Sequence, residues 1–134
     1  MVLGGKRIDR SGAFMQTTIL TGIKPENPAF REEFFGPVAQ FFRVKNENAA
    51  IALANDSDFG LGGSVFTTDI SRGRRVATQV NTGMMFINHP TWTAPDLPFG
   101  GIMNSGYGRE LSSLGIQEFV NKKLVRIALL DAPA

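Results

Sequence analysis

Short runs of β-branched and apolar residues alternate along this chain with short runs of helix-forming residues. Four runs have the composition of strands, namely residues 17–23, 38–44, 64–68 and 82–88. Three segments follow a residue able to cap a helix, namely a short one after Asn27, residues 47–55 after Asn46, and residues 70–80 after Asp69. From residue 38 onward, strands and helices alternate, which predicts a parallel sheet with right-handed crossovers. We therefore expect an α/β fold with a three-layer parallel sheet and flanking helices.

The pattern changes in the last third of the chain. Residues 89–108 form a long connection without periodicity, and such segments in compact domains are usually functional or disordered. Trp92 and Phe99, which stand among rigid prolines, favour order. A helix is predicted over residues 109–122, with a glycine that interrupts it. Residues 123–130 then alternate and predict a terminal strand with one apolar face, which would seek a partner strand.

Composition narrows the class of protein. The 134 residues are 43% hydrophobic, which permits one domain with its own core. A formal net charge of +2 is too small for a nucleic-acid-binding surface. No apolar run is long enough to cross a membrane, and the first residues contain no apolar signal core. We therefore expect a cytoplasmic protein with neither nucleic-acid nor membrane partners.

The absence of cysteine is the strongest chemical constraint. It excludes disulfides, thiolate metal sites and a cysteine nucleophile. The aspartates have no spacing typical of metal ligands, so we expect no metal site. Glycines that could be taken for a phosphate cradle are more simply turn residues, namely those at 60, 62, 63, 100, 101, 106 and 108. A cluster of three arginines at 72, 74 and 75 is more simply a solvated helix face.

Two motifs connect the chain to a known family. The first is Glu32-Glu33-Phe34-Phe35-Gly36-Pro37, and the second runs from Leu97 through Pro98-Phe99-Gly100-Gly101 to Gly108-Arg109-Glu110. In this order and separation they resemble the aldehyde dehydrogenases. The residues within the motifs most resemble those of the succinate-semialdehyde dehydrogenase branch. The resemblance covers nearly the whole chain but only the C-terminal end of much longer family members. It implies a partial catalytic domain over residues 1–122 and an oligomerisation strand with a tail over 123–134.

The resemblance also implies roles for particular residues. Glu33 matches the carboxylate that binds the nicotinamide ribose hydroxyls, and Phe35 matches the aromatic residue that backs the nicotinamide. Trp92, Thr93 and Phe99 match the aldehyde pocket. Residues 123–130 match the strand that extends the sheet of a neighbouring subunit, which implies a homo-oligomer.

The same resemblance shows what this sequence lacks. The family needs a cysteine thiolate, a glutamate that activates water, an asparagine for the oxyanion and a domain that holds the rest of NAD(P). We therefore expect the cofactor contacts to be vestigial and no cofactor to bind this chain alone. The first hypothesis is a truncated, self-associating dehydrogenase-like protein that does not oxidise aldehydes by itself. Met103, where a basic residue is common in the family, leaves the shape of its loop open.

Two further hypotheses remain open. One is a small esterase-like hydrolase acting on short-chain activated esters, with Ser105, His89 and Asp96 as an acyl-transfer triad. Ser64 is an alternative serine for that triad. The sequence has no Gly-x-Ser-x-Gly turn, however, so the single histidine is more simply a loop or capping residue. The other hypothesis is one fragment of a split dehydrogenase that complements a second fragment.

A simpler structural role also competes with the cofactor contact. Glu32 and Glu33 could be an acidic pair in the first turn of the short helix after Asn27, where the helix dipole favours negative charge. The position of that helix decides between the two interpretations.

Overall fold

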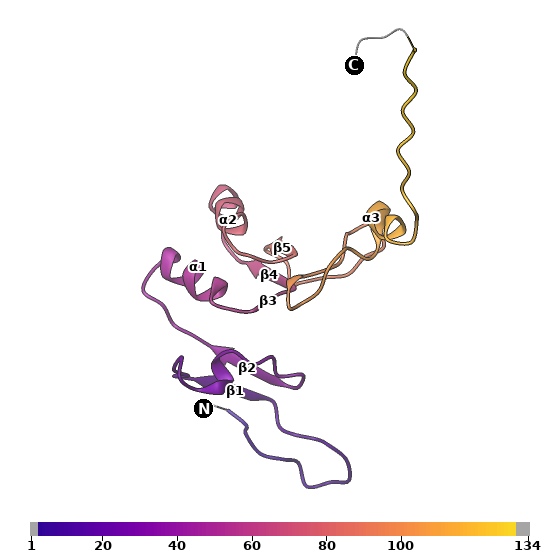
Figure 1. The fold of residues 1–134 in the computed structure, drawn as a ribbon. Helices are drawn as coiled ribbons and strands as arrows, with labels where there is room; N and C mark the ends of the chain where they lie inside the picture. The colour runs from indigo at the N-terminus through magenta and orange to yellow at the C-terminus, as the bar shows by residue number, and fades with distance from the viewer. Residues whose placement is uncertain (1–2, 131–134) are drawn as a thin grey trace. The chain divides into compact units, whose positions relative to one another are not determined.

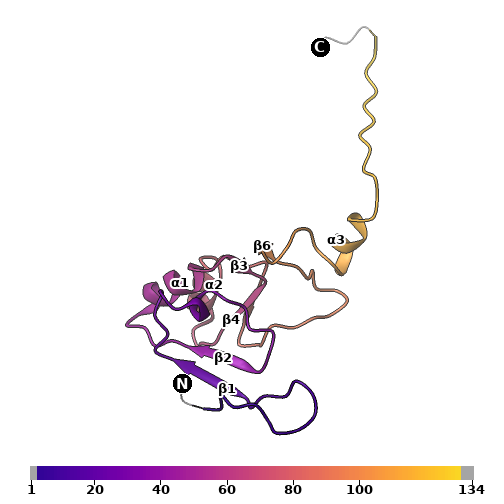
Figure 2. The same ribbon diagram turned by 60° about the horizontal axis from the view of Figure 1, so that its bottom comes forward.

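The chain folds into two compact units. The computed structural model describes residues 3–130 (Figures 1 and 2). The first unit combines the chain up to Asp58 with residues 78–81, and the second combines residues 59–77 with the chain from Thr82 onward. Each unit contains one pair of parallel strands.

The first unit is organised by two strands, β1 (Thr18–Thr21) and β2 (Val38–Phe41). They pair in parallel, with their first residues opposite each other. Both strands lie where β-branched and aromatic residues predict them, although each is shorter than expected. The pair is joined in sequence by a connection long enough for a parallel crossover.

A single turn of 3-10 helix, η1 (Pro28–Phe30), lies in that connection. Asn27 caps it as predicted, because its side-chain oxygen accepts a hydrogen bond from the Ala29 N–H at 3.0 Å. The turn ends before Glu32 and Glu33, so the interpretation that places these acids in its first turn is wrong. Glu32 and Glu33 follow the turn in backbone that is neither helix nor strand.

The first long helix is α1 (Glu47–Asn55), which has the predicted bounds. Asn46 caps it, since its Oδ1 accepts a backbone hydrogen bond at 2.9 Å. At the other end, the Asn55 side chain donates to the Gln79 carbonyl and accepts from the Asn81 N–H, each at 2.8 Å. These two bonds tie a short, later segment of the chain to the first unit.

The second unit is organised by β4 (Gly62–Val65), β5 (Met84–Ile87) and the helix between them, α2 (Ile70–Ala77). The strands pair in parallel and α2 contacts both of them. Asp69 caps α2 as predicted, because its Oδ1 accepts from the N–H of the third helical residue at 2.9 Å. The strand–helix–strand order of this region is therefore confirmed, with shifted ends.

A short antiparallel pair was not predicted. It joins β3 (Phe59–Gly60) to β6 (Ile102–Met103). The strand β6 lies inside the connection over residues 89–108, which is therefore more regular than its sequence indicates. Two-residue strands have too few positions to show a period, so the pattern of the sequence could not reveal them.

The helix expected from residue 109 begins later, as α3 (Ser112–Gln117). Glu110 cannot join it, because its backbone pairs with Phe99 through two hydrogen bonds of 2.7 and 2.8 Å. Gly115, expected to interrupt the helix, lies inside it and is buried. A Cβ at that position would stand 3.0 Å from the Glu110 backbone, which explains why a glycine is accommodated there.

The expected terminal strand over residues 123–130 is not formed. Residues 121–129 form neither helix nor strand, and Figure 1 draws them after α3 as a tube without coil or arrow. A strand needs backbone partners along an edge, and these residues pair with nothing in the described part of the chain. Residues 131–134, which belong to the expected tail, lie outside the described residues.

The predicted α/β class with parallel strands is confirmed, but the single three-layer sheet is not found. Residues 3–130 form three separate two-stranded sheets, namely β1–β2, β3–β6 and β4–β5. The alternation of the sequence predicts which segments are strands, whereas the choice of neighbours in a sheet depends on contacts between distant segments.

Many large apolar side chains are exposed on the described residues. Phe35, Phe119 and Leu124 are 99%, 87% and 91% exposed. Among the described residues, Met84 is the one large apolar residue that counts as buried, at 8% exposure. The expectation of a self-sufficient core is therefore not met. No helix among residues 3–130 has the length and hydrophobicity needed to cross a membrane.

Among the described residues, Thr18 is the polar residue whose side chain is buried. Thr18 is only 3% exposed. Its oxygen accepts from the Gly5 N–H at 2.9 Å and donates to the Gln16 carbonyl at 2.8 Å. One side chain therefore ties the start of β1 to the segment before it.

Replacing Thr18 by valine tests this role. Thr18→Val keeps the branched shape and leaves one N–H and one carbonyl without a partner, so the free energy of unfolding should fall by about 1–3 kcal/mol. Urea unfolding followed by circular dichroism measures it. Thr17→Val is the matched control, because Thr17 is exposed and should change stability by less than about 0.5 kcal/mol. Equal stability of the two variants would contradict this role.

Candidate functional site

The segment between η1 and β2 carries the two residues matched to cofactor contacts. Glu33 is exposed and lies outside any helix or strand, and Phe35 is 99% exposed. The segment is held at the amino end of β2, because the Thr18 N–H donates to the Pro37 carbonyl at 2.8 Å. Phe34 is half-buried, so one of the two phenylalanines packs against the protein and the other does not.

This arrangement fits one part of a dinucleotide. An exposed carboxylate can accept hydrogen bonds from two vicinal hydroxyls, and an exposed aromatic face can support a flat ring. A ring of this size in contact with water on both sides is an unfavourable exposure that a ligand or further protein would relieve. Glu33 and Phe35 therefore have the chemistry that suits a nicotinamide ribose and a nicotinamide ring.

The residues matched to the aldehyde pocket lie in the second unit. Trp92 is 58% exposed, and its ring meets the His89 ring edge-on at 6.0 Å between centroids. His89 in turn lies 6.0 Å from the ring of Phe86 on β5. Phe99 is half-buried and Thr93 is exposed. No ring contact joins Phe99 to Trp92 in the described part of the chain.

The three residues of the hydrolase hypothesis are not joined by hydrogen bonds. His89 Nδ1 donates to the Pro90 carbonyl at 2.7 Å, whereas a triad needs this nitrogen to donate to an aspartate. The Ser105 hydroxyl oxygen accepts from the Gly60 N–H at 3.0 Å. Asp96 is exposed. The geometry places His89 as a loop residue and offers no arrangement for acyl transfer.

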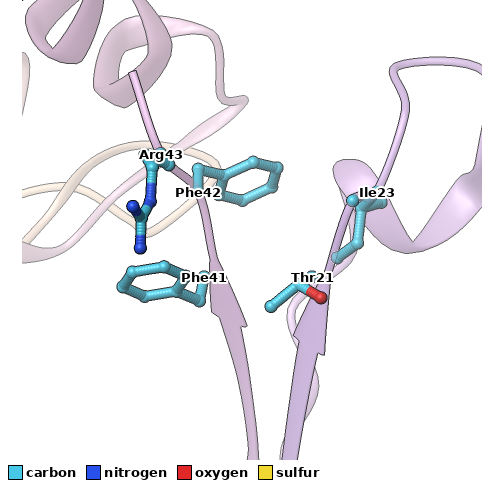
Figure 3. Close-up of a pocket in the computed structure, with 6 residues that line it drawn as sticks. Thr21, Ile23, Phe41, Phe42 and Arg43 are labelled. Carbon is cyan, nitrogen blue, oxygen red and sulfur yellow. The ribbon is translucent and has the colours of Figure 1, made fainter. Parts of the chain in front are cut away.

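An open cleft of about 480 Å³ lies at the carboxyl ends of β1 and β2 (Figure 3). Its lining residues are Thr21, Gly22, Ile23, Phe41, Phe42 and Arg43. Figure 3 shows the Arg43 side chain extending toward the Phe41 ring. Glu33 and Phe35 precede β2, so they stand at the opposite end of that strand, roughly 13 Å away for four residues. The cleft is therefore separate from the cofactor contacts.

Sequence patterns missed two hydrogen bonds that hold the loop carrying Phe99. The Ser105 hydroxyl oxygen accepts from the Gly60 N–H of β3 at 3.0 Å, and Arg109 Nη1 donates to the Gly101 carbonyl at 3.0 Å. Only the paired backbones of β3 and β6 bring these residues together, so no local signal could reveal them. Within residues 3–130, no group of three His, Cys, Asp or Glu residues stands close enough to hold a metal ion.

Comparison with known proteins agrees with the motifs. The family model for the aldehyde dehydrogenase family matches residues 1–125. The chain is 56% identical over 126 residues to a succinate-semialdehyde dehydrogenase (NADP+) of Deinococcus radiodurans, covering 94% of this chain and 26% of the relative. It is 49% identical over 125 residues to a probable enzyme of the same name from Synechocystis, covering 93% of this chain and 28% of the relative.

Solved structures give the same result. The structure of Gox0499 matches with a TM-score of 0.90 at 63% identity, covering 95% of this chain and 28% of that protein. The succinic semialdehyde dehydrogenase of Streptococcus pyogenes, in complex with NADP+, matches with a TM-score of 0.88 at 47% identity, covering 93% of this chain and 28% of that protein. The chain thus spans little more than a quarter of these relatives, and it belongs to the aldehyde dehydrogenase family.

Proposed function

We propose that this chain contributes the nicotinamide-ribose contact and one wall of the aldehyde pocket to an NADP+-dependent succinate-semialdehyde dehydrogenase. The observation that carries the proposal is the exposed pair Glu33 and Phe35 at the amino end of β2. A relative with 56% identity over nearly the whole chain is named for that reaction, which supports the substrate and the cofactor.

Each residue has a defined task in this proposal. The Glu33 carboxylate accepts hydrogen bonds from the ribose hydroxyls and fixes the position of the adjacent ring. Phe35 supports one face of that ring, which sets the angle for hydride transfer. Trp92 and Phe99 exclude water from the aldehyde. When bound, NADP+ supplies the acceptor for the hydride.

The covalent step of the family lies outside these residues. Oxidation of an aldehyde through a thioester needs a thiolate nucleophile, and this sequence has no cysteine. We therefore propose that the 134 residues act joined to, or associated with, the remaining part of a dehydrogenase. The large exposed apolar surface supports this proposal, because such surface is stable in water only when another protein segment covers it.

A chimera tests the proposed function. In the Deinococcus relative, the segment that matches this chain is replaced by this chain, and NADPH formation from succinate semialdehyde is followed. We expect an active enzyme. Glu33→Gln should raise the KM for NADP+ about tenfold or more, since hydrogen bonds to a charged group contribute about 1.5–3 kcal/mol.

The neighbouring acid provides the matched control. Glu32→Gln makes the same chemical change at an exposed position one residue earlier, and its KM for NADP+ should stay within about twofold of the parent chimera. An inactive chimera that is nevertheless folded contradicts the proposed function. Equal effects of the two substitutions contradict the role of Glu33 alone.

We also propose that residues 123–130 pair with a second copy of the chain. Five large apolar side chains in this stretch are largely exposed, namely Leu124, Val125, Ile127, Leu129 and Leu130. Their backbone groups have no partners within the described residues. A strand from another copy would pair with these backbone groups and also cover the apolar side chains. In an extended strand, Val125, Ile127 and Leu129 share one face.

A charge on that face should prevent association. Ile127→Lys places an ammonium group in the proposed interface, so we expect light scattering after size-exclusion chromatography to report a smaller assembly than for the parent chimera. Ala128→Lys introduces the same residue on the opposite face and should leave the assembly unchanged. An identical mass for both variants and the parent contradicts the proposed interface.

A further inference from the structure

The loop that carries Phe99 is closed at its base by main-chain pairing. Phe99 and Glu110 exchange two backbone hydrogen bonds of 2.8 and 2.7 Å. Within the loop, β6 pairs with β3 so that Met103 stands opposite Phe59. These main-chain pairings fix few residues of the loop and give it little resistance to displacement by themselves.

Close backbone packing holds the residues directly after Phe99 from one side. A Cβ on Gly83 would lie 1.9 Å from the Gly100 carbonyl oxygen and 2.8 Å from Gly101 Cα. The chain just before β5 therefore lies against the backbone of the loop with no room for a side chain. Gly101 is buried as a result.

Side chains hold the same residues from within the loop. Ser105 is half-buried, and its Cβ would lie 2.5 Å from a Cβ on Gly101. Its hydroxyl oxygen accepts from the Gly60 N–H of β3 at 3.0 Å. Arg109 adds a hydrogen bond to the Gly101 carbonyl at 3.0 Å.

These contacts make Ser105 the link between the loop and the strand beneath it. Gly60 already uses its carbonyl to accept from the Gly83 N–H at 2.9 Å. One residue of β3 therefore bonds both to the segment packed on the loop and to the loop itself. Removing the hydroxyl of Ser105 would leave the Gly60 N–H, which is partly buried, without its acceptor.

We infer that Ser105 is a positioning residue for the aldehyde pocket, fixing Phe99 through its hydrogen bond to Gly60. The inference rests on the proposed function, because Phe99 meets the aldehyde only if that function holds. It assigns Ser105 a task unrelated to nucleophilic catalysis. The hydroxyl acts on substrate binding through the backbone and touches neither the aldehyde nor the cofactor.

The kinetic signature of such a residue differs from that of general damage. A displaced Phe99 weakens contacts with the aldehyde but leaves the cofactor contacts of Glu33 intact. Ser105→Ala in the active chimera should therefore raise the KM for succinate semialdehyde about fivefold to tenfold, the size expected when part of a buried hydrogen bond is lost. The KM for NADP+ should stay within about twofold. Partial unfolding alone would lower kcat and leave both KM values unchanged.

Two further variants sharpen the test. Ser113→Ala removes the same atom from an exposed position in α3 and should leave both KM values unchanged. Ser105→Thr keeps the hydroxyl oxygen and should restore the KM for succinate semialdehyde. If Ser105→Ala fails to fold, the threonine variant still tests the inference, because loss of the parent KM despite a retained hydroxyl would contradict it.

A readout independent of activity completes the experiment. In the 134-residue chain, amide hydrogen exchange of Gly60 should be faster in Ser105→Ala than in the parent, and unchanged in Ser113→Ala. Unchanged exchange of Gly60 in Ser105→Ala would overturn the role of the Ser105–Gly60 hydrogen bond. An unchanged KM for succinate semialdehyde in that variant would overturn the effect of Ser105 on the aldehyde pocket. An inactive parent chimera would overturn the proposed function instead. The exchange measurement would still decide whether the hydrogen bond between Ser105 and Gly60 holds the loop.

Discussion

Parallel strand pairs need cover on both faces, and this requirement governs the whole molecule. Each unit contains one such pair, and a two-stranded sheet has too little apolar surface of its own to form an interior. α2 covers β4 and β5 in part, which is why the one buried methionine of the described chain, Met84, lies there. Many other large apolar side chains among the described residues are exposed.

The exposed positions of the chain also bear on its proposed chemistry. Phe35 faces solvent almost completely because it supports a ring that comes from outside the chain in the proposed function. The same holds for residues 121–129, which stay irregular because a strand requires partners for its backbone. In the proposed function, these exposed surfaces are the positions at which the chain meets a cofactor or another polypeptide.

The candidate functional residues are divided between the two units. The first holds the carboxylate and aromatic ring suited to the nicotinamide end of a cofactor, and the second holds the loop with Trp92 and Phe99. In the second unit, direct contact between two backbone segments holds the loop that carries Phe99. A Cβ on Gly83 would collide with the Gly100 carbonyl, and a Cβ on Gly101 would collide with Ser105. Ser105 in turn accepts a hydrogen bond from Gly60. A loop placed in this way is defined by main-chain geometry, which makes it sensitive to small substitutions.

The sequence by itself determined the local elements and the family. Side-chain caps act within a few residues, so Asn27, Asn46 and Asp69 mark helix starts correctly. The two motifs indicate the aldehyde dehydrogenase family, to which the chain belongs. The tertiary structure alone decided which strands pair, where α3 begins and what Ser105 does. Those features depend on segments up to 45 residues apart, such as Gly60 and Ser105. A local pattern carries no information about such partners, because their meeting is set by packing across the fold.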